Sequence, residues 1–215
     1  MLLSQPAPSF DDLVDQFPGL GAILWDLDGT ILMTEVVHAN AYKTIINQND
    51  EDLDDSIDIA ELEKKCMGQT DPRVFKELQQ LGMLTKYDEK SFLEHKNLTM
   101  RSEITKWKTE DLLHTDLKNL IISAHKHGIK QAVVTSSERD TAEVLLEHVG
   151  LREYFQFTVA REDTEYNKPS PQPYLKAMAD LGLKSNEVLI FEDSEVGLTA
   201  AKESQSHVIP ARWYY

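Results

Sequence analysis

The sequence predicts an α/β protein in which helices cover both faces of a parallel sheet and a helical segment is inserted after the first strand. Short apolar runs alternate with helical patterns over most of the chain, which is typical of strand–helix–strand units with right-handed crossovers. The stretch 36–104 breaks this alternation because its patterns are helical throughout. We therefore expect a core formed by residues 1–35 and 105–215 and an α-helical cap domain formed by residues 36–104.

The predicted strands are short runs of β-branched or other apolar residues, each followed by a turn. They span residues 22–25, 131–134, 157–160, 188–191 and 207–209. Runs without polar alternation indicate strands that are buried on both faces.

Helices are predicted from apolar spacing together with start and stop residues. In the core, residues 111–127 end at Gly128, residues 138–149 end at Gly150, and a third helix follows Pro171 and ends at Gly182. In the insert, residues 36–47, 56–66, 72–81 and 88–106 have helical patterns.

The charge of the chain excludes two classes of partner. There are 22 Lys and Arg against 37 Asp and Glu, a formal net charge of -15. Nucleic acid and anionic membranes are bound by clustered basic residues, so we expect neither partner. The single cysteine, Cys66, excludes an internal disulfide, and no apolar run reaches the roughly 18 residues of a membrane span. Without a signal-peptide pattern, we expect a cytoplasmic protein, and a monomer by default.

Two carboxylates follow the first predicted strand directly. Asp26 and Asp28 are two residues apart, so extended backbone points both side chains the same way. In phosphoryl transfer one carboxylate can attack phosphorus while the other exchanges a proton with the leaving oxygen and with water. Gly29 permits a sharp turn that brings backbone donors towards the phosphate. Alone, the pattern is equally compatible with a turn or part of a calcium loop.

Three further motifs follow in order, and with DLDGT at residues 26–30 they resemble the four signatures of the haloacid dehalogenase superfamily. They are Thr135 in AVVTSS, Lys168 in NKPSP, and Glu192 with Asp193 in LIFEDSEVG. Each residue lies near the end of a predicted strand, where groups converge at the carboxyl edge of a sheet. Thr135 and Lys168 are 33 residues apart, close to one strand–helix–strand unit of roughly 30, whereas Asp26 and Thr135 are 109 apart. About 70 residues are therefore inserted after the first motif.

The resemblance implies a Rossmann-like core and Mg²⁺-dependent phosphate transfer through an aspartyl-phosphate intermediate. Asp26 would be the nucleophile and Asp28 the acid and base, while Thr135 and Lys168 would stabilise the phosphate. The Mg²⁺ ligands would be Asp26, Asp28, Glu192 and Asp193. The residues expected to contact the substrate's phosphate are Leu27, Gly29, Thr30 and Ser136.

The subgroup of phosphoglycolate phosphatase and β-phosphoglucomutase resembles this chain most, which implies a small phosphorylated substrate such as a sugar phosphate or phosphoglycolate. Cap residues expected to contact that substrate are His38, Gln69 and Arg73, although His38 is also compatible with an ordinary helix start. In β-phosphoglucomutase an arginine of the cap binds the remote phosphate, and Asp71 stands at that position here. This departure disfavours a mutase.

Two alternatives to a phosphatase stay open. A sugar phosphomutase would use the same core residues and a cap that excludes water. A non-catalytic binding or regulatory protein of the same fold is disfavoured, because every residue expected for catalysis and metal binding is present. Ser136 and Ser137 also stand where a helix starts, and for Ser137 we favour helix capping over phosphate binding.

Overall fold

The computed structural model describes residues 6–49, 64 and 71–214 and divides into two compact units. The core unit comprises Met1–Met33 and Lys108–Tyr215, and the helical unit comprises Thr34–Trp107. The predicted insert, 36–104, lies within the helical unit, and its function as a cap stays a prediction. None of the helices in the described residues combines the length and the apolar character needed to traverse a membrane.

The core unit is built on a parallel sheet, which confirms the predicted α/β fold. Its strands run in the order β3-β2-β1-β4-β5, with β1 in the middle. The chain therefore continues to one side of β1 for β2 and to the other side for β4. In open α/β sheets, ligands bind beyond the carboxyl ends of the strands at such a reversal. The strands are β1 (Ala22–Trp25), β2 (Lys130–Val134), β3 (Thr158–Val159), β4 (Val188–Glu192) and β5 (His207–Pro210).

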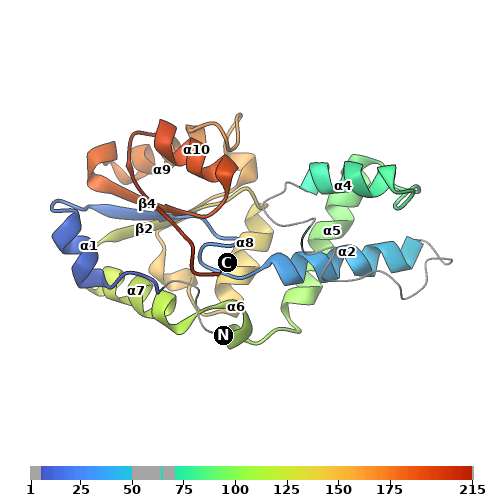
Figure 1. The fold of residues 1–215 in the computed structure, drawn as a ribbon, viewed down its shortest axis with the longest axis horizontal. Helices are drawn as coiled ribbons and strands as arrows, with labels where there is room; N and C mark the ends of the chain where they lie inside the picture. Colours follow the sequence, from blue (N-terminus) through green and yellow to red (C-terminus); the bar gives the residue numbers. More distant parts are fainter. Residues whose placement is uncertain (1–5, 50–63, 65–70, 215) are drawn as a thin grey trace. The chain divides into compact units, whose positions relative to one another are not determined.

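Helices cover both faces of this sheet. Helices α9 and α10 lie on one face, and α1 and α7 lie on the other (Figure 1). The helices of the core unit are α1 (Phe10–Gln16), α6 (Thr109–Leu112), α7 (Thr115–Lys126), α8 (Arg139–His148), α9 (Gln172–Leu181) and α10 (Glu195–Glu203). Short 3₁₀ turns span Arg152–Tyr154, Arg161–Asp163 and Ser185–Glu187.

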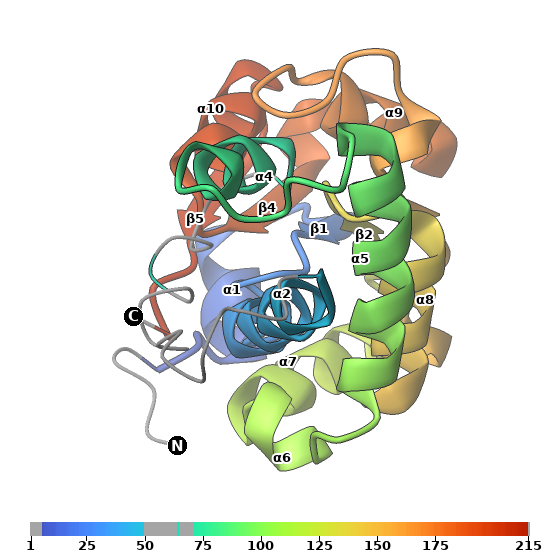
Figure 2. The ribbon, with the colours of Figure 1, turned by 90° about the vertical axis from the view of Figure 1, so that its right-hand side faces the viewer.

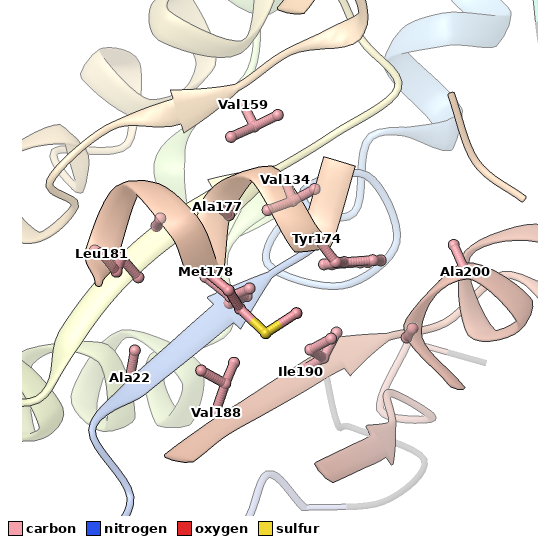
Figure 3. Close-up of a cluster of buried hydrophobic side chains, with 13 residues drawn as sticks. Ala22, Val134, Val159, Tyr174, Ala177, Met178, Leu181, Val188, Ile190 and Ala200 are labelled. Atoms are coloured by element: carbon pink, nitrogen blue, oxygen red, sulfur yellow. The ribbon is translucent and has the colours of Figure 1, made fainter. Parts of the chain in front are cut away.

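The face under α9 forms a continuous apolar core. Side chains of α9 pack onto residues of the three central strands (Figure 3). Each fully buried aliphatic or aromatic side chain contributes about 1.5–3 kcal/mol relative to an exposed one, so this layer anchors the strands whose ends carry the site. The packed residues include Tyr174, Ala177, Met178 and Leu181 on the helix and Ala22, Val134, Val188 and Ile190 on the strands.

One helix prediction is wrong. The residues 111–127 do not form a single helix, because α6 ends at Leu112 and α7 begins at Thr115. Leu113 and His114 between them have extended backbone, and Nδ1 of His114 accepts the N–H of Asp116 as an N-cap. Leu113 is only 5% exposed although it lies outside both helices. Because Leu113 is apolar and buried, the helical pattern of apolar residues continues through it, and the pattern therefore did not reveal the interruption between α6 and α7.

The helical unit contains α2 (Glu35–Asn49), α4 (Asp71–Gln80) and α5 (Glu89–Ile104). Figure 2 views α2 and α4 end-on, with α5 running beside both. Phe92 on α5 is stacked against Phe75 and Tyr42, with ring centroids 4.7 and 5.9 Å apart. The unit therefore has its own aromatic core. The predicted helix 56–66 lies, apart from Lys64, outside the described residues.

Candidate active site

Two acidic side chains meet at the carboxyl edge of the sheet. Parallel pairing aligns Trp25 of β1 with Phe191 of β4, so Asp26 and Glu192 are level at the next position. The N–H of Asp26 donates to the carbonyl of Phe191 at 3.0 Å. Because side chains alternate along strands, both carboxylates point to the face that α9 covers. Two buried carboxylates side by side require positive charge nearby.

Lys168 supplies one such charge. Its ammonium lies 2.6 Å from Oδ1 of Asp26 and 3.4 Å from Oε1 of Glu192. It also donates to the carbonyl of Val134 at 2.9 Å, and it lies over the ring of Tyr174, 5.0 Å from the centroid. The Lys168 side chain is 3% exposed. Contacts on every side hold this cation against the predicted nucleophile.

Burial dominates the ionisation of these groups. It raises the pKa of Asp26 from 3.8 to about 7, because the opposing effect of Lys168 is smaller and Asp193 adds repulsion. Burial likewise raises the pKa of Glu192 from 4.5 to about 7, with a further contribution from Asp26. Burial alone would lower the pKa of Lys168, but the two carboxylates outweigh it and the pKa lies well above 10.5. One cation thus does not offset the effect of burial on both carboxylates.

A metal ion fits the remaining negative charge. Asp26, Glu192 and Asp193 each offer a carboxylate oxygen, and these oxygens lie within 4.8 Å of one another. Oε2 of Glu192 is buried and has no hydrogen-bond partner among the described residues. Hard oxygen donors of this kind suit a divalent cation such as Mg²⁺. Asp28, which was also predicted as a ligand, is not part of this cluster.

Asp28 is turned towards two hydroxyl groups instead. Oγ of Ser137 donates to Oδ2 of Asp28 at 2.7 Å, and Oγ1 of Thr135 lies 3.5 Å from the same oxygen. The N–H of Ser137 donates to Oγ1 of Thr135 at 3.0 Å, which orients that hydroxyl. The capping prediction for Ser137 is wrong, because α8 begins at Arg139 with Glu138 as its N-cap. Ser136 is exposed beyond β2, and its contact with phosphate stays a prediction.

The loop after Asp26 has internal partners. Oγ1 of Thr30, a fully buried residue, donates to Oδ1 of Asp193 at 2.8 Å. Gly29 has φ 82°, which favours glycine, and its N–H donates to the carbonyl of Leu32 at 2.7 Å. The side chain of Leu27 is buried, so only its backbone is available to a ligand. Substrate contacts by Leu27, Gly29 and Thr30 stay predictions, and the Thr30 hydroxyl orients a carboxylate of the acidic cluster.

Two residues that were given no role hold Glu192 in place. Oγ of Ser194, the N-cap of α10, donates to Oε1 of Glu192 at 3.0 Å and accepts the N–H of Gly197 at 3.0 Å. A Cβ at Gly197 would lie 1.7 Å from Oε1 of Glu192. The glycine therefore makes the space that the carboxylate fills. The signal for this was the spacing of Glu192, Ser194 and Gly197 within the last motif.

The predicted cap residues belong to the helical unit. Arg73 on α4 is exposed and pairs with Glu77, with 3.3 Å between Nε and Oε1. His38 lies on α2, and Gln69 lies outside the described residues. Whether any of them contacts substrate stays a prediction.

The helical unit also holds a buried charge pair that the sequence did not reveal. Nζ of Lys96, whose side chain is 2% exposed, lies 3.0 Å from Oδ2 of Asp71, and Tyr42 donates its hydroxyl to Oδ1 at 2.5 Å. Burial raises the pKa of Asp71, but Lys96 and His38 outweigh it, so the pKa lies below its ordinary value. Asp71 is therefore ionised and bound to Lys96.

The geometry of the core unit agrees with comparisons to known proteins. A profile of the haloacid dehalogenase-like hydrolase family matches residues 23–211. The chain belongs to this hydrolase family. Fructose-1-phosphate phosphatase YqaB of Escherichia coli (strain K12) is 27% identical over 200 residues, which cover 93% of this chain and 99% of that protein. Protein CbbY of Rhodobacter capsulatus is 30% identical over 195 residues, 88% of this chain and 84% of that protein.

Solved structures agree with the fold of this haloacid dehalogenase-like hydrolase. β-Phosphoglucomutase from Clostridium difficile has a TM-score of 0.71 and 21% identity, covering 89% of this chain and 84% of that chain. At this identity the likeness concerns the fold. The family assignment predicted from the four motifs is confirmed.

Proposed function

We propose that this hydrolase is a Mg²⁺-dependent phosphatase that hydrolyses the monophosphate of a small sugar or similar compound through an aspartyl phosphate on Asp26. The observation that carries the proposal is the pairing of two carboxylates with different surroundings. Asp26 is buried against Lys168 and two further acidic residues, whereas Asp28 is held by hydroxyl groups and is less buried. Separate surroundings suit separate roles for the two groups.

In the first half-reaction, a carboxylate oxygen of Asp26 forms a bond to phosphorus while the bond from phosphorus to the leaving oxygen breaks. Asp28 gives its proton to that leaving oxygen, which departs as an alcohol. The ammonium of Lys168, 2.6 Å from Asp26, balances the negative charge that gathers around the phosphoryl group.

In the second half-reaction, water attacks the phosphorus of the aspartyl phosphate. Asp28 takes a proton from this water, so it returns to its starting state. The bond between phosphorus and Asp26 breaks, and inorganic phosphate leaves. Mg²⁺ held by Asp26, Glu192 and Asp193 would supply Lewis-acid charge that lowers the repulsion between the anionic substrate and these carboxylates.

Two observations support a sugar monophosphate as the substrate class. One relative, matched along almost its whole length, is a fructose-1-phosphate phosphatase. In addition, Asp71 stands at the position where β-phosphoglucomutase carries the cap arginine for the remote phosphate, so that cation is absent from this position here. This supports a phosphatase over a mutase that handles a bisphosphate.

The test is phosphate release from a panel of sugar phosphates, phosphoglycolate and pyrophosphate, with Mg²⁺ or with EDTA. We expect metal-dependent release that Asp26→Asn lowers by about 10³-fold or more, because a nucleophile is lost. Asp180→Asn, which alters an exposed pair with Lys176, is the matched control and should keep wild-type turnover. Full turnover by Asp26→Asn would sink the proposal, and isomerised sugar phosphate without phosphate release would assign a mutase.

A further inference from the structure

Residues 211–214 follow β5 and run along the backbone that carries the site. Three consecutive residues donate hydrogen bonds to its carbonyl groups. The N–H of Ala211 donates to Glu192 at 2.8 Å, and Nη1 of Arg212 donates to Asp193 at 3.3 Å. The indole N–H of Trp213 donates to Thr30 at 2.7 Å. These four residues, Ala211–Tyr214, are called the clamp segment below.

The bond from Trp213 reaches a metal-binding carboxylate through one further residue. Trp213 holds the backbone of Thr30, and the hydroxyl of Thr30 donates to Oδ1 of Asp193 at 2.8 Å. Thr30 and Asp193 are 163 residues apart in the chain, so local backbone geometry does not set their distance. The hydroxyl of Thr30 therefore holds the side chain of Asp193, and the guanidinium of Arg212 holds its backbone carbonyl.

The indole of Trp213 is itself rigidly placed. It is 3% exposed, and its ring centroid lies 5.5 Å from that of Phe191. Phe191 is in turn stacked on Trp25, with 4.5 Å between centroids. Trp25 and Phe191 directly precede Asp26 and Glu192 in the two strands. The clamp segment is thus packed, through Trp213, against aromatic residues of the two strands that precede the carboxylates.

We infer that Trp213 and Arg212 are positioning residues that set the place of Asp193 for a divalent cation. This inference rests on the proposed function, in which Asp26, Glu192 and Asp193 hold that cation. Groups that orient metal ligands commonly contribute 10–100-fold to metal affinity. Trp213 acts through Thr30 and does not touch the carboxylate, so the effect belongs at the lower end of this range, about tenfold.

The experiment measures Mn²⁺ binding to the full chain without substrate, by titration calorimetry and by the electron paramagnetic resonance of free Mn²⁺. Trp213→Phe keeps an aromatic ring but removes the donor to Thr30, and it should raise the Kd for Mn²⁺ about tenfold. Trp25→Phe is the matched control, since it keeps an aromatic ring in the same stack and removes an indole N–H that donates to Oε1 of Gln131 at 3.0 Å and not to the loop of Thr30. Trp25→Phe should lower Tm by about as much as Trp213→Phe does, and it should leave the Kd for Mn²⁺ unchanged.

A double-mutant cycle tests the route through Thr30. Because the hydroxyl of Thr30 transmits the effect, Trp213→Phe should change the Kd little in a Thr30→Val background. If the two substitutions instead raise the Kd by independent factors that multiply in the double variant, Thr30 does not transmit the effect of Trp213. If Trp213→Phe does not fold, Arg212→Met tests the same inference, because Arg212 is exposed and its loss should weaken Mn²⁺ binding without unfolding the chain.

The outcomes separate this inference from the proposed function. If the wild-type protein binds Mn²⁺ and the Trp213→Phe and Arg212→Met variants bind it equally well, the positioning role of the clamp segment is overturned and the proposed function is not. Equal weakening in Trp213→Phe and Trp25→Phe would also overturn it, because a general loss of stability would then suffice. Wild-type protein that binds no Mn²⁺ would overturn the metal site and the inference with it.

Discussion

At the scale of single residues, hydroxyl groups orient the acidic side chains of the site. Ser137 donates to Asp28, Ser194 donates to Glu192, and Thr30 donates to Asp193. A hydrogen bond to a charged group is worth about 1.5–3 kcal/mol and fixes the direction in which its lone pairs point. Each of these three carboxylates therefore has a neutral donor of its own, whereas Asp26 has Lys168.

Ser137→Ala should lower kcat about tenfold with little change in KM. The loss of one hydrogen bond of about 1.5 kcal/mol, close to a factor of ten in rate, leaves Asp28 less well aligned for proton transfer, while phosphate binding by other groups is retained. Steady-state kinetics with the best substrate of the panel measures both constants. Ser206→Ala is a suitable control, since Ser206 precedes β5 at the opposite edge of the sheet. An unchanged kcat in Ser137→Ala would show that this bond does not orient Asp28 for catalysis.

At the scale of elements, the start of α10 serves the site directly. Ser194 caps the helix, and the absent side chain of Gly197 leaves room for the carboxylate of Glu192. An alanine in a helix is ordinarily more stable than a glycine by about 1 kcal/mol. The steric conflict at this position should reverse that preference.

Gly197→Ala should destabilise the protein by about 1–3 kcal/mol, the usual cost of overpacking a filled site. Glu192 is 1% exposed, and its Oε1 is bonded to Lys168 and Ser194, so moving the carboxylate away from a new Cβ would break these contacts. Urea denaturation measures the change. Val196→Ala, in the same turn at a side chain that is 37% exposed, should change the stability little. A Gly197→Ala protein as stable as wild type would mean that Glu192 is not held where the structure places it.

The buried charge pair between Asp71 on α4 and Lys96 on α5 gives a second prediction at this scale. Lys96→Met should cost about 3 kcal/mol of stability, because it leaves the carboxylate of Asp71 largely buried without its cation. Lys90→Met removes an exposed partner of Glu94 and should cost less than about 0.5 kcal/mol. Thermal unfolding of both variants at one pH makes the comparison. Equal losses would contradict the assignment of Lys96 as a buried, paired charge.

At the scale of the whole molecule, the acidic cluster should make stability depend on pH and metal. The folded chain raises the pKa of Asp26 from 3.8 and that of Glu192 from 4.5, both to about 7. Between these limits the folded state binds more protons than the unfolded state, so stability falls as pH rises. Lys168 stays charged throughout this window and does not alter the slope.

Metal-free protein should therefore have a lower Tm at pH 7.5 than at pH 5, and Mg²⁺ should raise Tm more at pH 7.5. At pH 5 protons compete with the metal for the same carboxylates. Scanning fluorimetry with EDTA or Mg²⁺ measures both effects. Asp26→Asn removes one titrating group and should flatten the slope. An identical slope in that variant would show that the pH dependence arises elsewhere, for example from the net charge of -15.

The order of elements and the chemistry-bearing residues could be predicted from the sequence because each depends on local information. Apolar runs at 22–25 and 188–191 place strands within a residue of β1 and β4, and an acidic residue follows each run directly. Parallel strands share a carboxyl edge, so a common site for Asp26, Lys168 and Asp193 follows from the order of the motifs. The sequence by itself thus determined the fold class, the family and three members of the acidic cluster, Asp26, Glu192 and Asp193, whereas Asp28, predicted with them, lies outside that cluster.

The partners of those residues were decided by the tertiary structure alone. Ser137 was assigned to helix capping because its local position allows that role, and only the approach of the loop after β1 gives its hydroxyl to Asp28. Lys96 and Asp71 become a buried pair only when α5 packs beside α4. Trp213 belongs to no motif, yet its indole reaches a carbonyl 183 residues earlier. Such contacts depend on packing between distant segments, which neither periodicity nor spacing encodes.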